Sequence, residues 1–333
     1  MKLFAMFTVC LLACKSTKPE GGQAKTTEET AAAAAAGDSP TDALSKKLNG
    51  YVHCLNDFTN DVFKGRHTWL DQFDPTKGPQ AKQAASSLYG PLKLPEIEKC
   101  KTEVAAAKAM QPSMPALEKA GEAYVAAIAE LQPLTVKLRT YFEQGNYKDD
   151  KLALAIELHP KLMEAYAKFR PANEALGNEV DKLEDRLAGE QLAELEKTEG
   201  KQLLWHHKKM LIDAKKLVGF AGVGSPADIK DPAALQAAVA AFDTSVTALL
   251  DYYAKHKDAI EKKSMSYWTI ENSLKTFLVD AKNLMRRNRD KQAFSSGEQM
   301  TINANNPQAV DGHPARVIAS YNSVIDTSNR MRF

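Results

Sequence analysis

Apolar residues recur along most of the chain at three- and four-residue spacing, which is the periodicity of an amphipathic α-helix. After Ser39 and Pro40, for example, Leu44, Leu48 and Leu55 fall on one helical face, and proline suits the first helical position. No segment shows a convincing alternation of apolar and polar residues of the strand kind. The pattern therefore predicts an all-α fold from residue 39 onward.

Breaker segments divide this region into helices. They are FDPTKGPQ, MQPSMP, GFAGVGSPADIKDP and the polar stretch SSGEQMTINANNPQAVDGH. The helices expected between them begin near Pro40, Pro95 and Ser113, run over residues 149–220 and 231–291, and resume after Pro314. We expect bends at Pro133, Pro160 and Pro171. Long helices joined by short breakers predict one elongated antiparallel bundle of long kinked helices over residues 39–333, rather than two separate domains.

The opening segment is typical of an export signal. Lys2 precedes an apolar run at residues 3–12, which is too short to span a bilayer. The run ends in LLAC at residues 11–14, which resembles the lipobox of bacterial lipoproteins. We therefore expect a signal peptide at residues 1–13 and lipid attachment at Cys14. The alternatives are a secretory signal with an incidental cysteine, or a wrong start codon.

Residues 14–38 are interpreted as a lipid-anchored flexible tether. The stretch after Cys14 contains no large apolar residue and cannot bury a core. As a flexible chain it would hold the folded part on the order of 27 Å from the lipid. Because Lys15, not aspartate, follows the anchor, the periplasmic face of the outer membrane is the expected location. The membrane, reached through the lipid, is the first expected partner.

Charge argues against nucleic-acid binding. The chain carries a net charge of +2, which falls to +1 when Lys2 leaves with the signal, and acidic and basic residues are interspersed. A nucleic-acid-binding protein would be expected to show a basic face. No nucleic-acid partner is expected.

The stretch YFEQGNYKDDKLALAIELHPKL, residues 141–162, is predicted to be a corner between two helices. Gly145 suits a helix C-terminus, and Asp149 suits the N-cap of the next helix, with Asp150 in its first turn. His159 shares the apolar face of that helix. It is interpreted as a core residue, with a functional role as the alternative.

Several tyrosines and polar residues suggest a second hypothesis. They could form a cluster at one end of the bundle that binds a ligand or has a structural role. Its members are Tyr51, Asn56, Tyr141, Tyr147, Asp149, Asp150, His159 and Tyr321. The alternative is ordinary core packing, in which each tyrosine hydroxyl forms a hydrogen bond at the core edge.

A family resemblance rests on short segments in a fixed order. They are YVHCLN (51–56), RHTWL (66–70), KGP (77–79), YF (141–142), YKDD (147–150), LH (158–159) and YN (321–322). Together they resemble the YiiG-like family of bacterial lipoproteins, a domain of unknown function, over most of the chain after the tether. The resemblance implies the envelope location and the helical fold, and it implies no reaction.

No residue pattern supports catalysis. The sequence contains no phosphate-binding glycine loop, no HExxH, no paired CxxC and no GxSxG. His206 and His207, beside Trp205, are the best metal candidate. Adjacent helical residues point about 100° apart, however, and Lys208 and Lys209 would repel a cation. We therefore expect no catalytic residue, no metal and no cofactor.

Two cysteines remain once Cys14 is lipidated and the signal is removed. Cys54 and Cys100 would both lie in an oxidising compartment, which makes them a candidate disulfide. Each also lies on the apolar side of its predicted helix, so two buried free thiols are the alternative.

The two ends of the folded region are expected to meet. The first helix carries Tyr51 and Asn56 and the last carries Tyr321 and Asn322, so that the two could form hydrogen bonds across a contact. The competing arrangement packs the last helix on the helix of residues 231–291.

Taken together, the residues favour a lipid-anchored envelope protein that is a non-catalytic structural or protein-interaction module, with another envelope protein as its partner. The alternative is a periplasmic helical protein that binds a small molecule between its helices.

Overall fold

The computed structural model describes residues 40–261 and 267–331. These ranges form ten α-helices and four short 3-10 helices, without a β-strand, which confirms the all-α prediction. The predicted signal peptide and tether, residues 1–38, lie outside the described residues.

The described residues form two compact units, residues 40–187 and 188–331, where the sequence predicted a single bundle. The boundary falls inside one continuous helix, α5 (Ala153–Glu199). No glycine- or proline-rich linker therefore marks it in the sequence.

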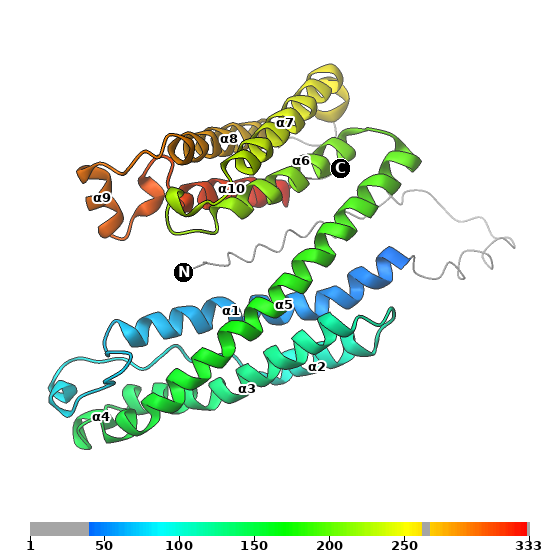
Figure 1. Cartoon of the computed structure of the whole chain (residues 1–333). Helices are drawn as coiled ribbons and strands as arrows, with labels where there is room; N and C mark the ends of the chain where they lie inside the picture. Colours follow the sequence, from blue (N-terminus) through cyan, green and yellow to red (C-terminus); the bar gives the residue numbers. More distant parts are fainter. Residues whose placement is uncertain (1–39, 262–266, 332–333) are drawn as a thin grey trace, which may run out of the picture. The chain divides into compact units, whose positions relative to one another are not determined.

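The first unit is built from helices that run alongside one another (Figure 1). They are α1 (Pro40–Leu70), α2 (Glu98–Ala109), α3 (Pro115–Glu143), the one-turn α4 (Asn146–Asp149) and the first part of α5. Edge-to-face and tilted aromatic pairs join three of these helices, with Phe169 of α5 against Phe63 of α1 and Tyr124 of α3. Pro133 lies inside α3, and Pro160 and Pro171 lie inside α5.

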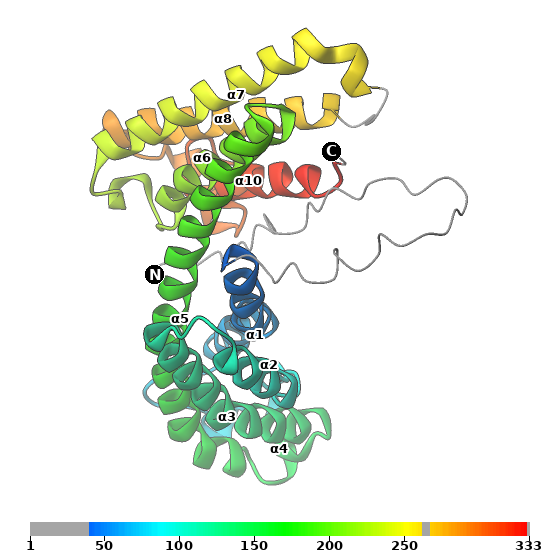
Figure 2. The ribbon, with the colours of Figure 1, turned by 90° about the vertical axis from the view of Figure 1, so that its right-hand side faces the viewer.

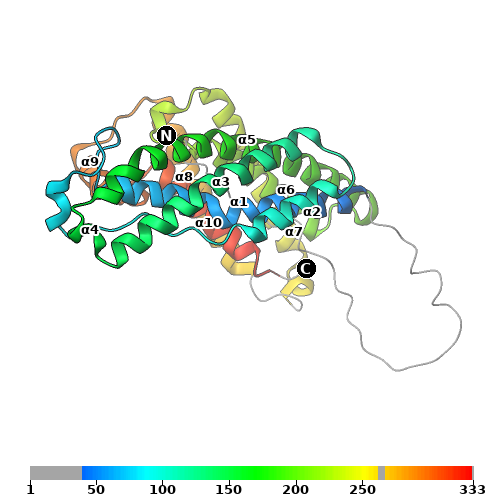
Figure 3. The ribbon, with the colours of Figure 1, turned by 90° about the horizontal axis from the view of Figure 1, so that it is seen from below.

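A long connection, residues 71–97, links α1 to α2 and contains the short 3-10 helix η1 (Ala81–Ala85). Figure 3 shows its first part at the same end of the unit as α4. Its second part lies against α3, where a Cβ added at Gly90 would meet the Cα atom of Arg139 at 2.7 Å. The side chain of Gln132 also donates to the Pro95 carbonyl at 2.8 Å. The connection is therefore a packed part of the unit.

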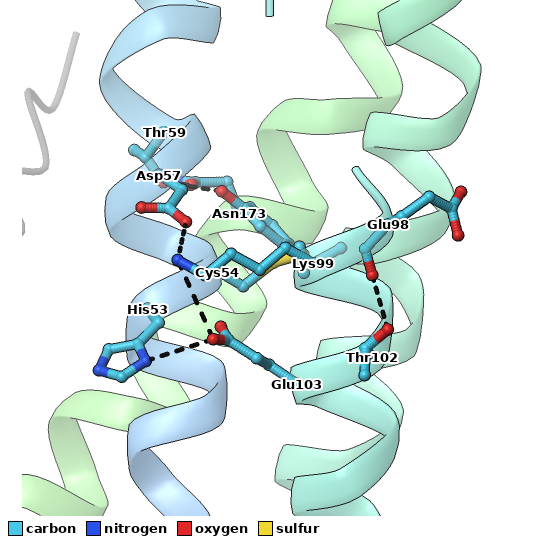
Figure 4. The surroundings of a disulfide bond; sticks show 11 residues. His53, Cys54, Asp57, Thr59, Glu98, Lys99, Thr102, Glu103 and Asn173 are labelled. Carbon is cyan, nitrogen blue, oxygen red and sulfur yellow. Dashed lines mark hydrogen bonds and ion pairs between the residues drawn. A yellow bond between two sulfur atoms is a disulfide. The ribbon is translucent and has the colours of Figure 1, made fainter. Parts of the chain in front are cut away.

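A disulfide and a network of buried hydrogen bonds join helices inside the first unit. Cys54 of α1 and Cys100 of α2 form a disulfide, with their Cα atoms 4.9 Å apart (Figure 4). Nearby, the buried Thr59 hydroxyl donates to Asn173 of α5 at 2.8 Å and lies 3.0 Å from the Tyr124 hydroxyl of α3. Because a buried polar group costs free energy without a partner, this network favours one register of α1, α3 and α5.

The second unit contains α6 (Leu203–Val218), α7 (Pro232–Glu261), α8 (Tyr267–Arg289), α9 (Ser296–Asn303) and α10 (Pro314–Ser328), shown in Figure 2. The 3-10 turns are η2 (Gly219–Ala221), η3 (Pro226–Asp228) and η4 (Pro307–Ala309). Helix α7 packs against α6 and α8, and α8 also packs against α10. The shared core includes Leu217, Leu235, Phe242, Phe277, Leu284 and Tyr321.

Two predicted long helices are wrong. The helix expected over residues 149–220 is interrupted at Gly200, whose φ of +76° is left-handed and favours glycine. The helix expected over residues 231–291 is two helices, α7 and α8, that pack together. Phe242 and Phe277 have ring centroids 4.9 Å apart, whereas 35 residues of straight helix would separate them by about 52 Å.

The last helix packs against a helix of its own unit. Helix α10 packs on α8, the competing arrangement, and the Tyr321 ring lies 5.6 Å from that of Phe277. In the first unit, Tyr51 packs against α3, where a Cβ added at Gly121 would lie 2.4 Å from its ring. Tyr51 and Tyr321 are thus each packed within their own unit.

Among the described helices, α7 alone is long and apolar enough to cross a membrane by length and composition. One face of it, which includes Leu235, Val239, Phe242 and Leu249, is buried in the core of the second unit. Core packing of that face therefore explains much of the apolar content of α7.

The disulfide gives the first testable prediction. It closes a loop with a sequence separation of 46, so its reduction should lower the free energy of unfolding by about 4 kcal/mol in the chain-entropy model. Chemical denaturation of the mature protein, with and without reductant, measures this. The double variant Cys54→Ala/Cys100→Ala is the control, because reductant should not change its stability. Two reactive thiols in the denatured, unreduced protein would contradict the bond.

Candidate functional site

The predicted corner at residues 141–162 is present and is built by unusual backbone conformations. Gly145 ends α3 with a φ of +75°, as a C-terminal glycine should, and α4 follows as a single turn. Lys151 and Leu152 then adopt positive φ values of 54° and 69° before α5 begins at Ala153. The chain thus reverses direction over a few residues.

The capping residue at this corner differs from the prediction. Asp149 is exposed and lies inside α4, where it does not cap α5. The carboxylate of Asp150 instead accepts a hydrogen bond from the backbone N–H of Leu154 at 3.3 Å. The two left-handed residues move the start of α5 beyond Leu152, which makes Asp150 the acceptor.

Two tyrosines attach the corner to its neighbours. The hydroxyl of Tyr141 donates to the carboxylate of Asp150, and burial, followed by this carboxylate, raises the pKa of Tyr141. The hydroxyl of Tyr147 donates to the Ser86 carbonyl of the α1–α2 connection at 3.3 Å, and its ring stacks on Phe142. Both tyrosines therefore act as structural links with satisfied hydroxyls.

His159 is the most constrained polar residue of the corner. It is 5% exposed, and its Nδ1 accepts a hydrogen bond from the indole Nε1–H of Trp69 at 3.0 Å. Its Nε2 lies 3.1 Å from the Pro75 carbonyl oxygen, to which it donates. One neutral tautomer, protonated at Nε2, satisfies both contacts.

The segment around Pro75 is shaped to fit this imidazole. Gly78 has a φ of +66°, and a Cβ added there would lie 2.8 Å from the His159 ring. Asp74 holds the turn, because its carboxylate accepts the backbone N–H groups of Lys77 at 2.7 Å and Thr76 at 2.9 Å. These two hydrogen bonds, that of Lys77 first, lower the pKa of Asp74.

This arrangement anchors the chain and contains no catalytic set. Both ring nitrogens of His159 are engaged within the fold, so neither is available to a substrate in this conformation. Within residues 40–261 and 267–331, no three His, Cys, Asp or Glu side chains form a group that could hold a metal ion.

The structure separates the predicted cluster. It brings Tyr141, Tyr147, Asp150 and His159 to one corner. Tyr51 is 18 residues before Trp69 on α1, about 27 Å away along the helix. Asn56 is exposed, not on the apolar face, and Tyr321 belongs to the core of the second unit. The eight residues do not line one site.

His206 and His207 diverge, as adjacent helical residues do. The ring of His206 lies beside Tyr252, at 5.0 Å between centroids. His207 is buried, and desolvation lowers its pKa to about 3. The pair therefore has no shared position for one ion.

Trp69, Pro75 and Gly78 were not among the predicted site residues. Trp69 and Gly78 lie in the segments RHTWL and KGP, which carried part of the family resemblance, whereas Pro75 lies in the breaker FDPTKGPQ. Only the fold places these segments beside His159, which follows Trp69 by 90 residues.

Comparison of two glycines tests the fit at His159. Both Gly78 and Gly145 have positive φ, so alanine at either should cost about 1 kcal/mol of backbone strain. A Cβ at Gly78 also meets the imidazole, while nothing lies within 4 Å of one at Gly145. Gly78→Ala should therefore destabilise the protein by about 1–3 kcal/mol more than Gly145→Ala in chemical denaturation. Equal losses would show that the loop does not pack on His159.

Comparison with known proteins gives a family without an assigned activity. The model of a family described as "Protein of unknown function (DUF3829)" matches residues 42–330. The chain is 25% identical over 293 residues to "Uncharacterized protein YiiG" of Escherichia coli (strain K12), covering 87% of this chain and 79% of that protein. No solved structure matches. These matches confirm the resemblance found in the sequence, and the chain belongs to the DUF3829 family of YiiG-like proteins.

Proposed function

We propose that this protein is a lipid-anchored component of the cell envelope, held at the periplasmic face of the outer membrane, and that its helical units form a non-catalytic structural or protein-interaction module. The observation that carries the proposal is LLAC at residues 11–14, which overlaps the end of the ten-residue apolar run at residues 3–12.

The sequence after Cys14 suits such an anchor. A cysteine carrying several acyl chains holds a protein stably on a membrane, whereas one chain gives only reversible binding. Residues 15–38 contain no large apolar side chain, so a soluble spacer would separate the lipid from the helical units.

The interior of the first unit supports a non-catalytic role. Several of its buried polar groups bind each other, as in the Thr59–Asn173 pair, or hold the backbone, as His159 does. Lys47 is likewise fully buried and pairs with Glu118 at 2.5 Å. These groups stabilise the packing of helices, which leaves them committed to the fold.

The alternative function, binding of a small molecule between helices, depended on tyrosines converging at one end of a bundle. Tyr51 packs on α3, Tyr147 stacks on Phe142 and Tyr321 packs on Phe277. Because these rings serve three separate packing sites, the interaction module is the better supported of the two.

Lipidation gives a direct test in an enteric host. Cys14→Ala should abolish incorporation of a palmitate analogue, whereas Cys10→Ala, within the apolar run, should retain it. Mass spectrometry of the mature protein should find an acylated N-terminal Cys14. An unmodified Cys14, or equal labelling of both variants, would contradict the anchor. Lys15→Asp should move the protein to the inner-membrane fraction in a density gradient.

The interaction role is tested by photo-crosslinking in intact cells. Most large apolar side chains are buried, but Tyr89 and Met300 are 58% and 73% exposed, so crosslinkers at these positions sample the surface. We expect at least one of them to capture a discrete envelope protein, identified by mass spectrometry. The exposed polar Gln299, next to Met300 on α9, is the matched control position. Identical diffuse products at all positions would contradict a specific partner.

A further inference from the structure

The contacts at His159 depend on which atoms carry protons. Trp69 donates to Nδ1 at 3.0 Å, and Nε2 donates to Pro75 at 3.1 Å. An indole N–H is only a donor, so it needs an acceptor opposite it. The observed arrangement therefore requires a neutral imidazole with a bare Nδ1.

Protonation would turn one of these two hydrogen bonds into a conflict. An imidazolium has an N–H at both nitrogens, so the Nδ1–H would face the Nε1–H of Trp69. The bond from Nε2 to Pro75 would survive, because Nε2 is a donor in both forms. The clash falls on the side of the ring that faces α1.

The helices around the imidazole ring place no charged side chain against it. The residues one turn away on α5 are Ala155, Ile156, Leu162 and Met163, which carry no charge. Helix α1 presents Trp69, and α3 presents Phe142 behind it, at 5.9 Å between ring centroids.

The connection supplies the charge. The carboxylate of Asp74 is close enough to the imidazole to interact with it electrostatically, and it also feels Lys77. Two other acids at this end have partners of their own, with Asp71 paired to His67 and Asp150 bound by Tyr141. The Asp74 carboxylate, which already accepts two backbone N–H groups of its own turn, would therefore stabilise a protonated His159 only through its charge, without a direct bond.

We propose that His159 is a proton-controlled latch between α1, the α1–α2 connection and α5. When neutral, it holds Trp69 and the turn at residues 74–78 in place. When protonated, it keeps its bond to Pro75 but releases Trp69, which loosens the last turn of α1.

Hydrogen exchange and fluorescence of the full chain in detergent micelles test the latch. As pH falls from 8 to 5, exchange in peptides covering residues 66–73, at the end of α1, should rise about tenfold after correction for the intrinsic rate, which is the effect of losing one buried hydrogen bond. In a Trp205→Phe/Trp268→Phe background, the fluorescence of Trp69 should change over the same pH range. Peptides from α10 should show no such rise.

Two variants decide the cause. His159→Gln can still accept from Trp69 and donate to Pro75 but does not titrate, so it should abolish both pH-dependent changes. If His159→Gln does not fold, Trp69→Phe replaces it, because without the indole N–H protonation has no bond to break. A pH step that persists in the folded variant would overturn the latch. So would constant exchange and fluorescence down to the pH at which the wild-type protein unfolds.

Discussion

The hydrogen bond from Trp69 to His159 is the constraint on which the end of the first unit depends. It joins the last turn of α1 to the second turn of α5, and the second nitrogen of the same ring holds Pro75 of the connection between α1 and α2. The ring is almost completely buried, so neither nitrogen can exchange its partner for water. The left-handed Gly78 and the turn around Asp74 fit the position that this ring occupies.

Local signals in the sequence predicted the helices well where caps and breakers were distinct. The first helix begins at Pro40, the third begins at Pro115, and Gly145 ends it with a left-handed conformation, all as expected from their sequence. Helix α9 was missed within a polar stretch, although Ser295 and Glu298 form a capping box that signals its start. The division into α7 and α8 was missed because residues 262–266, between them, contain no glycine or proline.

Long-range contacts were the part that periodicity could not supply. The apolar face of α10 shows that this helix must pack against another one. Several other helices also carry apolar faces, and their periodicity alone does not identify α8 as the partner. His159 was correctly assigned to the core from its place on the face of α5. Its partners were not, since Trp69 and Pro75 reach it only after the chain folds across α1 and the connection. The same limit explains why Tyr51 and Tyr321 were grouped with the corner.

The proposed envelope function draws on different parts of the chain. The proposed location rests on the segment around Cys14, and the proposed interaction rests on the helical units. The lipid anchor and the protein partner can therefore be tested separately. The corner at His159 concerns the fold itself. It explains why a histidine, rather than an apolar residue, suits this position, because only a side chain with both an acceptor and a donor can link an indole N–H to a carbonyl.

A double-mutant cycle on Trp69 and His159 measures the central claim most directly. The variants Trp69→Phe, His159→Phe and their combination, compared with wild type by chemical denaturation at neutral pH, isolate the coupling between the two side chains. The structure predicts a favourable coupling of about 1–2 kcal/mol, the contribution expected of a buried hydrogen bond with both partners satisfied. Additive losses, with a coupling near zero, would show that the two rings pack independently and would contradict the role of His159 as the link between α1 and α5.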